Sequence, residues 1–220
     1  MPHRHRQLRY AALALALSTL LVGCDNNEYF ITQPAGGGIG GGDNSGSGNA
    51  DGSFSYTDLR GDFLPGTAGP GAPDILDVSG RFDGVELAID ITFAEPVVPW
   101  LLNADNSLDG FLDLDLDGNP STGVASAVDD HGGDAGLGVD YYLALRSADG
   151  TSAALVNPVS KTTVLVPTTI LENTLAIRVD QSVIRGIAAR EIRFALVAGN
   201  PASAVTDYAP NRGYWSIPVP

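Results

Sequence analysis

The sequence predicts an all-β protein, an antiparallel β-sandwich that follows a secretion signal and a flexible linker. Three observations support this fold class. Apolar and polar residues alternate over several short segments, as they do in strands that bury one face. Proline and glycine occur in nearly every gap between these segments, at the spacing typical of a sandwich. The sequence contains neither long helical patterns nor repeats of fixed period.

Residues 1–23 have the features of a bacterial lipoprotein signal peptide. Three arginines precede the apolar segment AALALALSTL, which is too short to span a membrane comfortably. The segment ends in LVGC, residues 21–24, which resembles a lipobox. This resemblance implies cleavage before Cys24 and lipidation there by diacylglycerol and an acyl chain such as palmitate. An ordinary signal peptide that contains a cysteine is the alternative.

Cys24 is the only cysteine of the chain, so an intramolecular disulfide is excluded. Two or more acyl chains give stable anchoring to a bilayer, whereas one chain does not. We therefore expect a protein of the bacterial cell envelope, lipid-anchored at the periplasmic face of a membrane or at the cell surface.

Residues 24–53 are expected to form the lipidated cysteine and a flexible linker. Nine of the 17 residues from Gly36 to Gly52 are glycine, and most others are Asn, Ser, Asp or Ala. Such a segment buries too little apolar area to offset the entropy lost on ordering. The sequence thus predicts one folded domain, residues 54–220, tethered to the membrane.

Within this domain, four segments show the strict alternation expected of strands: 85–93, 139–146, 174–179 and 191–196. Weaker strand patterns occur at 74–79, 97–102, 111–117, 152–157, 161–166 and 213–219. A helical turn or short helix is expected around residues 181–190.

The chain is strongly acidic, with a formal net charge of −14. Removal of residues 1–23 takes away three basic and no acidic residues, which leaves nine basic against 26 acidic side chains, a net charge of −17. Thirteen of the acids lie between Arg81 and Arg146, where there is neither lysine nor arginine. Such a surface repels nucleic acid and anionic lipid, and it suits metal cations.

Three aspartates, Asp113, Asp115 and Asp117, alternate along the predicted strand at 111–117. Residues on one face of a strand lie ~7 Å apart. Two carboxylates at that distance repel by only ~0.6 kcal/mol in water. An exposed aspartate row is therefore tolerable, and the alternation fits either a solvated face or a face against a bound cation.

The turn that follows favours a cation. Gly118 and Gly123 permit positive φ, so Asp, Asn and Thr oxygens of the turn can converge on one point. Calcium takes six to eight oxygen ligands in a flexible arrangement. The segment matches the first six positions of an EF-hand loop, but Val124 replaces the bidentate Glu, so it is not an EF-hand. The predicted calcium ligands come from this turn and from nearby acids: Asp113, Asp115, Asp117, Asn119, Thr122, Asp129, Asp130, Asp134 and Asp140. A solvated acidic loop is the alternative.

Four pieces of the sequence resemble one superfamily: DLRGD at 58–62, PDILDVSGRFDGVELAIDITF at 73–93, LDLDGNPSTG leading to GLGVDYYLAL, and DYAPNRGYW at 207–215. Together they resemble the DOMON-like β-sandwiches, which include family 9 carbohydrate-binding modules. The resemblance implies a non-catalytic, jelly-roll-like sandwich with structural calcium and the capacity to bind sugars. The positions that match its loop are Asp115, Asp117, Asn119, Thr122, Gly123 and Asp140.

Catalytic signals are weak, and we expect no enzyme. His131 is the only histidine after the signal peptide, and no nucleophile-elbow sequence occurs. A catalytic zinc site needs several His or Cys residues. Glycoside hydrolysis needs only two carboxylates, but the sequence identifies no pair.

Aromatic residues are the usual platform for a sugar ring, and the candidate ligand-binding residues are Trp100, Tyr142, Tyr208, Tyr214 and Trp215. Their alternative role is to fill the ends of the sandwich. The sequence therefore predicts a non-catalytic, calcium-stabilised binding module with a polysaccharide or glycan as the leading ligand. A structural or adhesive lipoprotein with a protein partner is the alternative, and a carboxylate-based glycoside hydrolase comes third.

Overall fold

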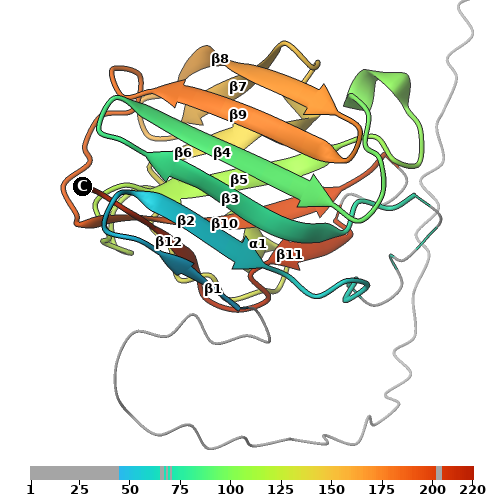
Figure 1. Cartoon of the computed structure of the whole chain (residues 1–220), viewed down its shortest axis with the longest axis horizontal. Helices are drawn as coiled ribbons and strands as arrows, with labels where there is room; N and C mark the ends of the chain where they lie inside the picture. Colours follow the sequence, from blue (N-terminus) through green and yellow to red (C-terminus); the bar gives the residue numbers. More distant parts are fainter. Residues whose placement is uncertain (1–44, 65–66, 68, 70, 202–204) are drawn as a thin grey trace, which may run out of the picture. The chain divides into compact units, whose positions relative to one another are not determined.

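The computed structural model describes residues 45–64, 67, 69, 71–201 and 205–220 (Figure 1). The predicted signal peptide, Cys24 and the predicted linker up to residue 44 lie outside the described residues. In the part of the chain that the structure describes, no helix has both the length and the apolar composition needed to cross a membrane.

The predicted all-β antiparallel fold is confirmed. Twelve strands occur among the described residues, and every pairing between them is antiparallel. They are β1 (Ser45–Gly48), β2 (Ser53–Thr57), β3 (Ile75–Phe82), β4 (Glu86–Phe93), β5 (Asp109–Asp115), β6 (Tyr141–Ala144), β7 (Ser152–Asn157), β8 (Thr162–Leu171), β9 (Thr174–Asp180), β10 (Glu191–Gly199), β11 (Asp207–Ala209) and β12 (Trp215–Pro218). The helical elements are three short turns: η1 (Trp100–Leu102), α1 (Ala127–Asp130) and η2 (Leu145–Ser147).

The strands form two layers that share β8. The first layer has the order β1-β2-β3-β4-β9-β8, and the second continues as β8-β7-β6-β5-β10 (Figure 1). Residues 162–167 of β8 pair with β7, whereas residues 168–171 pair with β9. The free side of β10 pairs with β12 through residues 191–194 and with β11 through residues 196–198.

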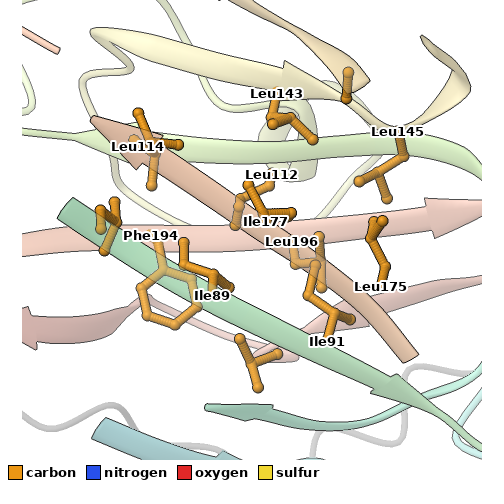
Figure 2. Close-up of a cluster of buried hydrophobic side chains, with 14 of the residues drawn as sticks. Ile89, Ile91, Leu112, Leu114, Leu143, Leu145, Leu175, Ile177, Phe194 and Leu196 are labelled. Atoms are coloured by element: carbon orange, nitrogen blue, oxygen red, sulfur yellow. The ribbon is translucent and has the colours of Figure 1, made fainter. Parts of the chain in front are cut away.

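The core lies between the two layers and contains the apolar faces that the alternation predicts. Figure 2 shows side chains of β4 and β9 from the first layer opposite side chains from the second layer. The labelled residues, all buried, are Ile89, Ile91, Leu175 and Ile177 of the first layer and Leu112, Leu114, Leu143, Leu145, Phe194 and Leu196 of the second.

An aromatic pair connects the layers at the side opposite β8. The ring of Tyr56 in β2 stacks on Trp215 of β12, with ring centroids 5.0 Å apart and planes 7° apart. The Tyr56 hydroxyl donates to the carbonyl oxygen of Ser216 at 2.7 Å. Trp215 is 4% exposed. It therefore fills the sandwich interior, which favours the alternative role that the sequence left open for this ring.

Two local predictions are also wrong. Residues 97–102 form one isolated bridge at Val98 and then η1 instead of a strand, because Pro96 and Pro99 lack the N–H that a strand ladder needs. Residues 181–190 form turns and irregular chain in place of a helix. Gly186, at φ +99°, interrupts helical geometry there.

Strand β1 lies inside the predicted linker, so the ordered sheet begins before residue 54. It pairs with β2 from Ser45 to Gly48. Its glycines approach their neighbours closely: a Cβ on Gly46 would lie 2.3 Å from a ring carbon of Tyr56, and one on Gly48 2.5 Å from Pro218. The strand therefore depends on backbone pairing and small residues, which an alternation pattern does not reveal.

Candidate metal centre

A second, smaller core covers the outer face of the second layer and positions the acidic turn. Strand β10 is buried on both faces, with Ala195 and Val197 on the side away from the main core. The chain between β5 and β6 folds over that side. The apolar residues that pack there are Val128, Ala135, Leu137 and Val139 of this segment together with Val205 and Tyr208. The acidic segment is therefore held against the sheet.

This cover explains the alternating aspartates of β5. Leu112 and Leu114 point into the main core, so Asp113 and Asp115 lie on the opposite side, beneath the segment 117–140. Asp113 is 3% exposed and Asp115 is fully buried. The solvated-face interpretation is therefore wrong for these two carboxyl groups.

Glycines bring the two ends of the covering segment together. Gly118 and Gly123 both have φ of +68°, as the turn requires. Val124 and Val139 form an antiparallel bridge through two backbone hydrogen bonds of 3.1 and 2.8 Å. A Cβ on Gly138 would lie 2.3–2.4 Å from backbone carbonyl oxygens of the turn, so only glycine permits this approach. This approach places Asp140 beside the start of the turn, where its carboxylate accepts the Leu116 N–H.

The result is a group of three carboxylates, Asp115, Asp117 and Asp140, each with an oxygen within 4.8 Å of the others. Asp115 Oδ1 accepts the N–H of Gly118 at 2.7 Å, and Asp140 Oδ2 accepts the N–H of Leu116 at 2.9 Å. Asp115 Oδ2 is buried and has no hydrogen-bond partner among the described residues. The backbone N–H groups of Gly118 and Gly138 both favour the ionised form of Asp115, and its buried Oδ2 is the oxygen left for a cation.

Burial raises the pKa of Asp115 and of Asp140, and the negative charge of Asp117 raises both further. Arg193 is the cross-strand partner of Asp115. Its guanidinium nevertheless donates to the carbonyl oxygen of Gly118 at 2.8 Å and to Glu191 at 3.0 Å, and it lies over the Tyr214 ring. It weakens the local negative potential without pairing directly with the three carboxylates.

The three oxygens suit calcium. Two oxygens bound to one calcium ion at 2.3–2.6 Å lie at most about 5 Å apart, and the observed limit of 4.8 Å meets that condition. Carboxylates are the hard oxygen ligands that calcium prefers. The Thr122 hydroxyl lies 2.8 Å from the carbonyl oxygen of Asn119 and 3.1 Å from both Asp117 oxygens, and the Asn119 N–H donates to Asp117 Oδ1 at 2.9 Å, so the turn orients that carboxylate.

The other predicted ligands lie outside this group. Asp113 Oδ2 accepts the Ser126 hydroxyl at 2.8 Å and the Ala127 N–H at 2.7 Å, and so secures the start of α1. Burial, with the charges of Asp129 and Asp130, raises the pKa of Asp113 to about 6.

The remaining acids of the segment serve the loop itself or face solvent. Asp129 Oδ1 accepts the Ala135 N–H at 2.6 Å. Asp130 and Asp134 are exposed. Asn119 Oδ1 accepts the Ser121 N–H at 3.1 Å inside the turn. The nine predicted ligands thus separate into three convergent carboxylates, the supporting Thr122, and residues with other roles.

Most of the predicted aromatic platforms are engaged elsewhere. Tyr208 is 6% exposed and its hydroxyl donates to the His131 carbonyl oxygen, which favours a packing role for this ring. The guanidinium of Arg146 lies 4.8 Å from the centroid of the Trp100 ring, and Arg193 lies 4.7 Å from that of Tyr214. One face of each of these two rings is therefore covered.

Tyr142 is the remaining aromatic candidate. It lies on the outer side of β6 and makes an edge-to-face contact with Phe111, with centroids 5.5 Å apart. Both rings line a cavity of about 240 Å³ together with Asp113 and Asp130. His131 is exposed, with its Nδ1 2.7 Å from the carbonyl oxygen of Ala127, and so serves the loop backbone.

Sequence reasoning missed a second acidic group, Asp58, Asp62 and Asp207, whose oxygens also lie within 4.8 Å of one another. Burial, followed by the charges of Asp58, Asp62 and Asp74, raises the pKa of Asp207 to about 9. Two short motifs that support the family resemblance, DLRGD and DYAPN, contain its members. Their separation along the chain gave no spacing that would mark them as a site.

Comparison with models of known protein families and with curated protein sequences gives no match. The DOMON-like resemblance therefore remains a prediction from the quoted motifs.

Proposed function

We propose that this chain is a non-catalytic, calcium-stabilised binding module, that a lipid anchor at Cys24 holds it at the bacterial cell envelope, and that its ligand is a carbohydrate. The observation that carries the calcium part is the convergence of Asp115, Asp117 and Asp140, with one buried oxygen of Asp115 left without a partner among the described residues.

Three carboxylates within 4.8 Å of one another repel, and each pair contributes ~3.5 kcal/mol at an effective dielectric constant of 20. Asp115 cannot reach solvent, because it is fully buried. A divalent cation removes the repulsion and supplies the missing partner of Asp115. It also fixes the turn to the strand that carries Asp140, so its role is structural.

The carbohydrate part rests on the cavity beside this centre. Tyr142 and Phe111 present aromatic surface there, and Asp113 and Asp130 add carboxyl groups. Aromatic rings with a few polar groups are the usual composition of a small-ligand pocket. A pyranose ring stacks on the aromatic surface while the acids accept its hydroxyl hydrogens.

Glycan binding tests this proposal. The chain from residue 24 to 220 carrying Cys24→Ser is applied to a glycan array in calcium and in chelator. We expect retention on some glycans, loss with Tyr142→Ala, and retention with the matched control Tyr142→Phe, which keeps the ring. Equal retention by Tyr142→Ala and wild type would contradict a role for this cavity.

The two alternatives give different results. A structural or adhesive lipoprotein binds no glycan and co-purifies with a protein partner. The hydrolase alternative has one supporting observation: Asp113, with its pKa raised to about 6, and Asp130 line the same cavity. It requires turnover of a glycoside that Asp130→Asn abolishes while calcium-dependent stability is unchanged.

A further inference from the structure

The second acidic group lies where the two layers meet at one end of the sandwich. Asp58 follows β2 directly, and Asp62 lies four residues later in the loop. Asp207 is the first residue of β11, which belongs to the other layer. Asp74, which precedes β3, lies close enough for its negative charge to act on Asp207. The group thus joins chain segments about 150 residues apart.

Backbone hydrogen bonds hold these segments in place. The N–H of Ile75 donates to Asp207 Oδ2 at 2.7 Å, and the N–H of Gly61 donates to both oxygens of Asp74 at 3.0 and 3.1 Å. The side-chain amide of Asn211 donates to Asp62 Oδ2. The carboxylates of Asp62, Asp74 and Asp207 therefore each have a hydrogen-bonded position without any metal contact.

Two oxygens of the group have no such bond. Asp207 is fully buried, and its Oδ1 has no hydrogen-bond partner among the described residues. The same holds for Oδ1 of the half-buried Asp62. A buried carboxylate oxygen without a donor is strongly unfavourable unless a cation or a proton supplies the missing interaction.

Negative charges dominate the surroundings of Asp207 in the described part of the chain. The charges that act on Asp207 are those of Asp58, Asp62 and Asp74, all negative. The nearby Arg60 is exposed and pairs with Glu95 at 2.8 Å. Neither Asp62 nor Asp207 takes part in a salt bridge among the described residues.

We propose that Asp58, Asp62 and Asp207 bind a second calcium ion, separate from the ion at Asp115, Asp117 and Asp140. The ligand oxygens lie within 4.8 Å of one another, which is compatible with one ion at calcium–oxygen distances. The ion fastens the loop after β2 in the first layer to β11 in the second. The second ion thus links the two layers at one end of the sandwich. The first ion instead orders the segment 117–140, which covers the outer face of the second layer.

Calcium stoichiometry tests this second site independently of the first. The chain from residue 24 to 220 with Cys24→Ser is freed of metal and dialysed to equilibrium against radioactive calcium over a range of concentrations. We expect two ions bound per wild-type chain, one per Asp62→Asn chain, one per Asp140→Asn chain and none in the double variant. Glu86→Gln, which removes an exposed charge in β4, is the matched control and retains two ions.

Asp207→Asn provides a second variant, since its amide oxygen can still accept the Ile75 N–H and so preserve the fold. Far-UV circular dichroism checks folding of each variant. The inference is overturned if Asp62→Asn and Asp207→Asn both keep the wild-type number of ions, because a proton then neutralises Asp207. It is also overturned if wild type binds one ion that Asp140→Asn abolishes. One ion lost in Asp62→Asn but kept in Asp140→Asn would support this site and refute the first.

Discussion

Replacement of Asp140 by Asn should have opposite effects on stability with and without calcium. Asp140 closes the three-carboxylate group, and its Oδ2 accepts the Leu116 N–H at 2.9 Å. The Asn amide oxygen can keep that hydrogen bond. The substitution therefore removes one negative charge and one calcium ligand with little change in shape.

The magnitude follows from the spacing. At 4.8 Å, each pair of ionised carboxylates repels by ~3.5 kcal/mol at an effective dielectric constant of 20. Asp117 and Asp140 are only half-buried, so solvent screening and proton uptake greatly reduce this repulsion energy. We expect Asp140→Asn to stabilise the metal-free protein by about 1–2 kcal/mol, after that reduction. Calcium at a hundredfold excess over Kd stabilises the wild type by about 2.7 kcal/mol, which the variant lacks.

Thermal unfolding by circular dichroism measures both effects. For a domain of this size 1 kcal/mol corresponds to about 2–4 °C in Tm. The variant should melt roughly 2–8 °C above wild type in chelator and below it in saturating calcium. Glu86→Gln, the control for loss of one charge, should respond to calcium like wild type. If Asp140→Asn gains as much from calcium as wild type does, the reasoning fails.

Three further predictions concern buried groups of β5 and the segment that covers it. Because the folded-state pKa of Asp113 is about 6, above the ordinary 3.8, the folded state retains a proton between these values. Asp113 should therefore lower metal-free stability as pH rises from about 4 to about 6, by up to about 3 kcal/mol. In urea unfolding between pH 4 and 6, the free energy of unfolding of Asp113→Asn should fall less with rising pH than that of wild type. Profiles of wild type and variant that run parallel would contradict the prediction. Arg146→Met should destabilise by about 2 kcal/mol because it leaves the buried Asp109 carboxylate unpaired, and adding Asp109→Asn should restore most of the loss. If the double variant is no more stable than Arg146→Met, the unpaired Asp109 carboxylate is not the cause of the destabilisation. Gly138→Ala should cost more than about 2 kcal/mol and weaken calcium binding, since its Cβ would overlap backbone oxygens. Gly136→Ala, in open space at φ +64°, should cost about 1 kcal/mol, and equal losses would refute the overlap argument.

The strands with one buried face were predictable because their signal is local. Leu112, Leu114 and the alternating residues of β4 and β9 occupy the core as the period of two predicts. Strand β10 could have been predicted more fully, since the run FALVA within it is apolar on both faces. That run indicates a sheet covered on its outer side. Strand β1 had no such signal, because Ser and Gly mark a linker as readily as a strand.

The first acidic group was only partly predictable. Asp115, Asp117 and Asp140 were among the predicted ligands, but sequence spacing could not separate them from Asp113, which binds the start of α1 instead. That distinction depends on how the covering segment folds. The second group depends on β11 reaching the loop after β2, a tertiary contact between distant segments. Local patterns carry no information about such a contact.

The central claim is that Asp115, Asp117 and Asp140 bind calcium. Anomalous diffraction data from crystals grown in calcium test it most directly. We expect an anomalous peak 2.3–2.6 Å from oxygens of Asp115, Asp117 and Asp140, with the free oxygen of Asp115 among the ligands. Carboxylates that stay together with only water between them, and no peak above noise at saturating calcium, would contradict the claim.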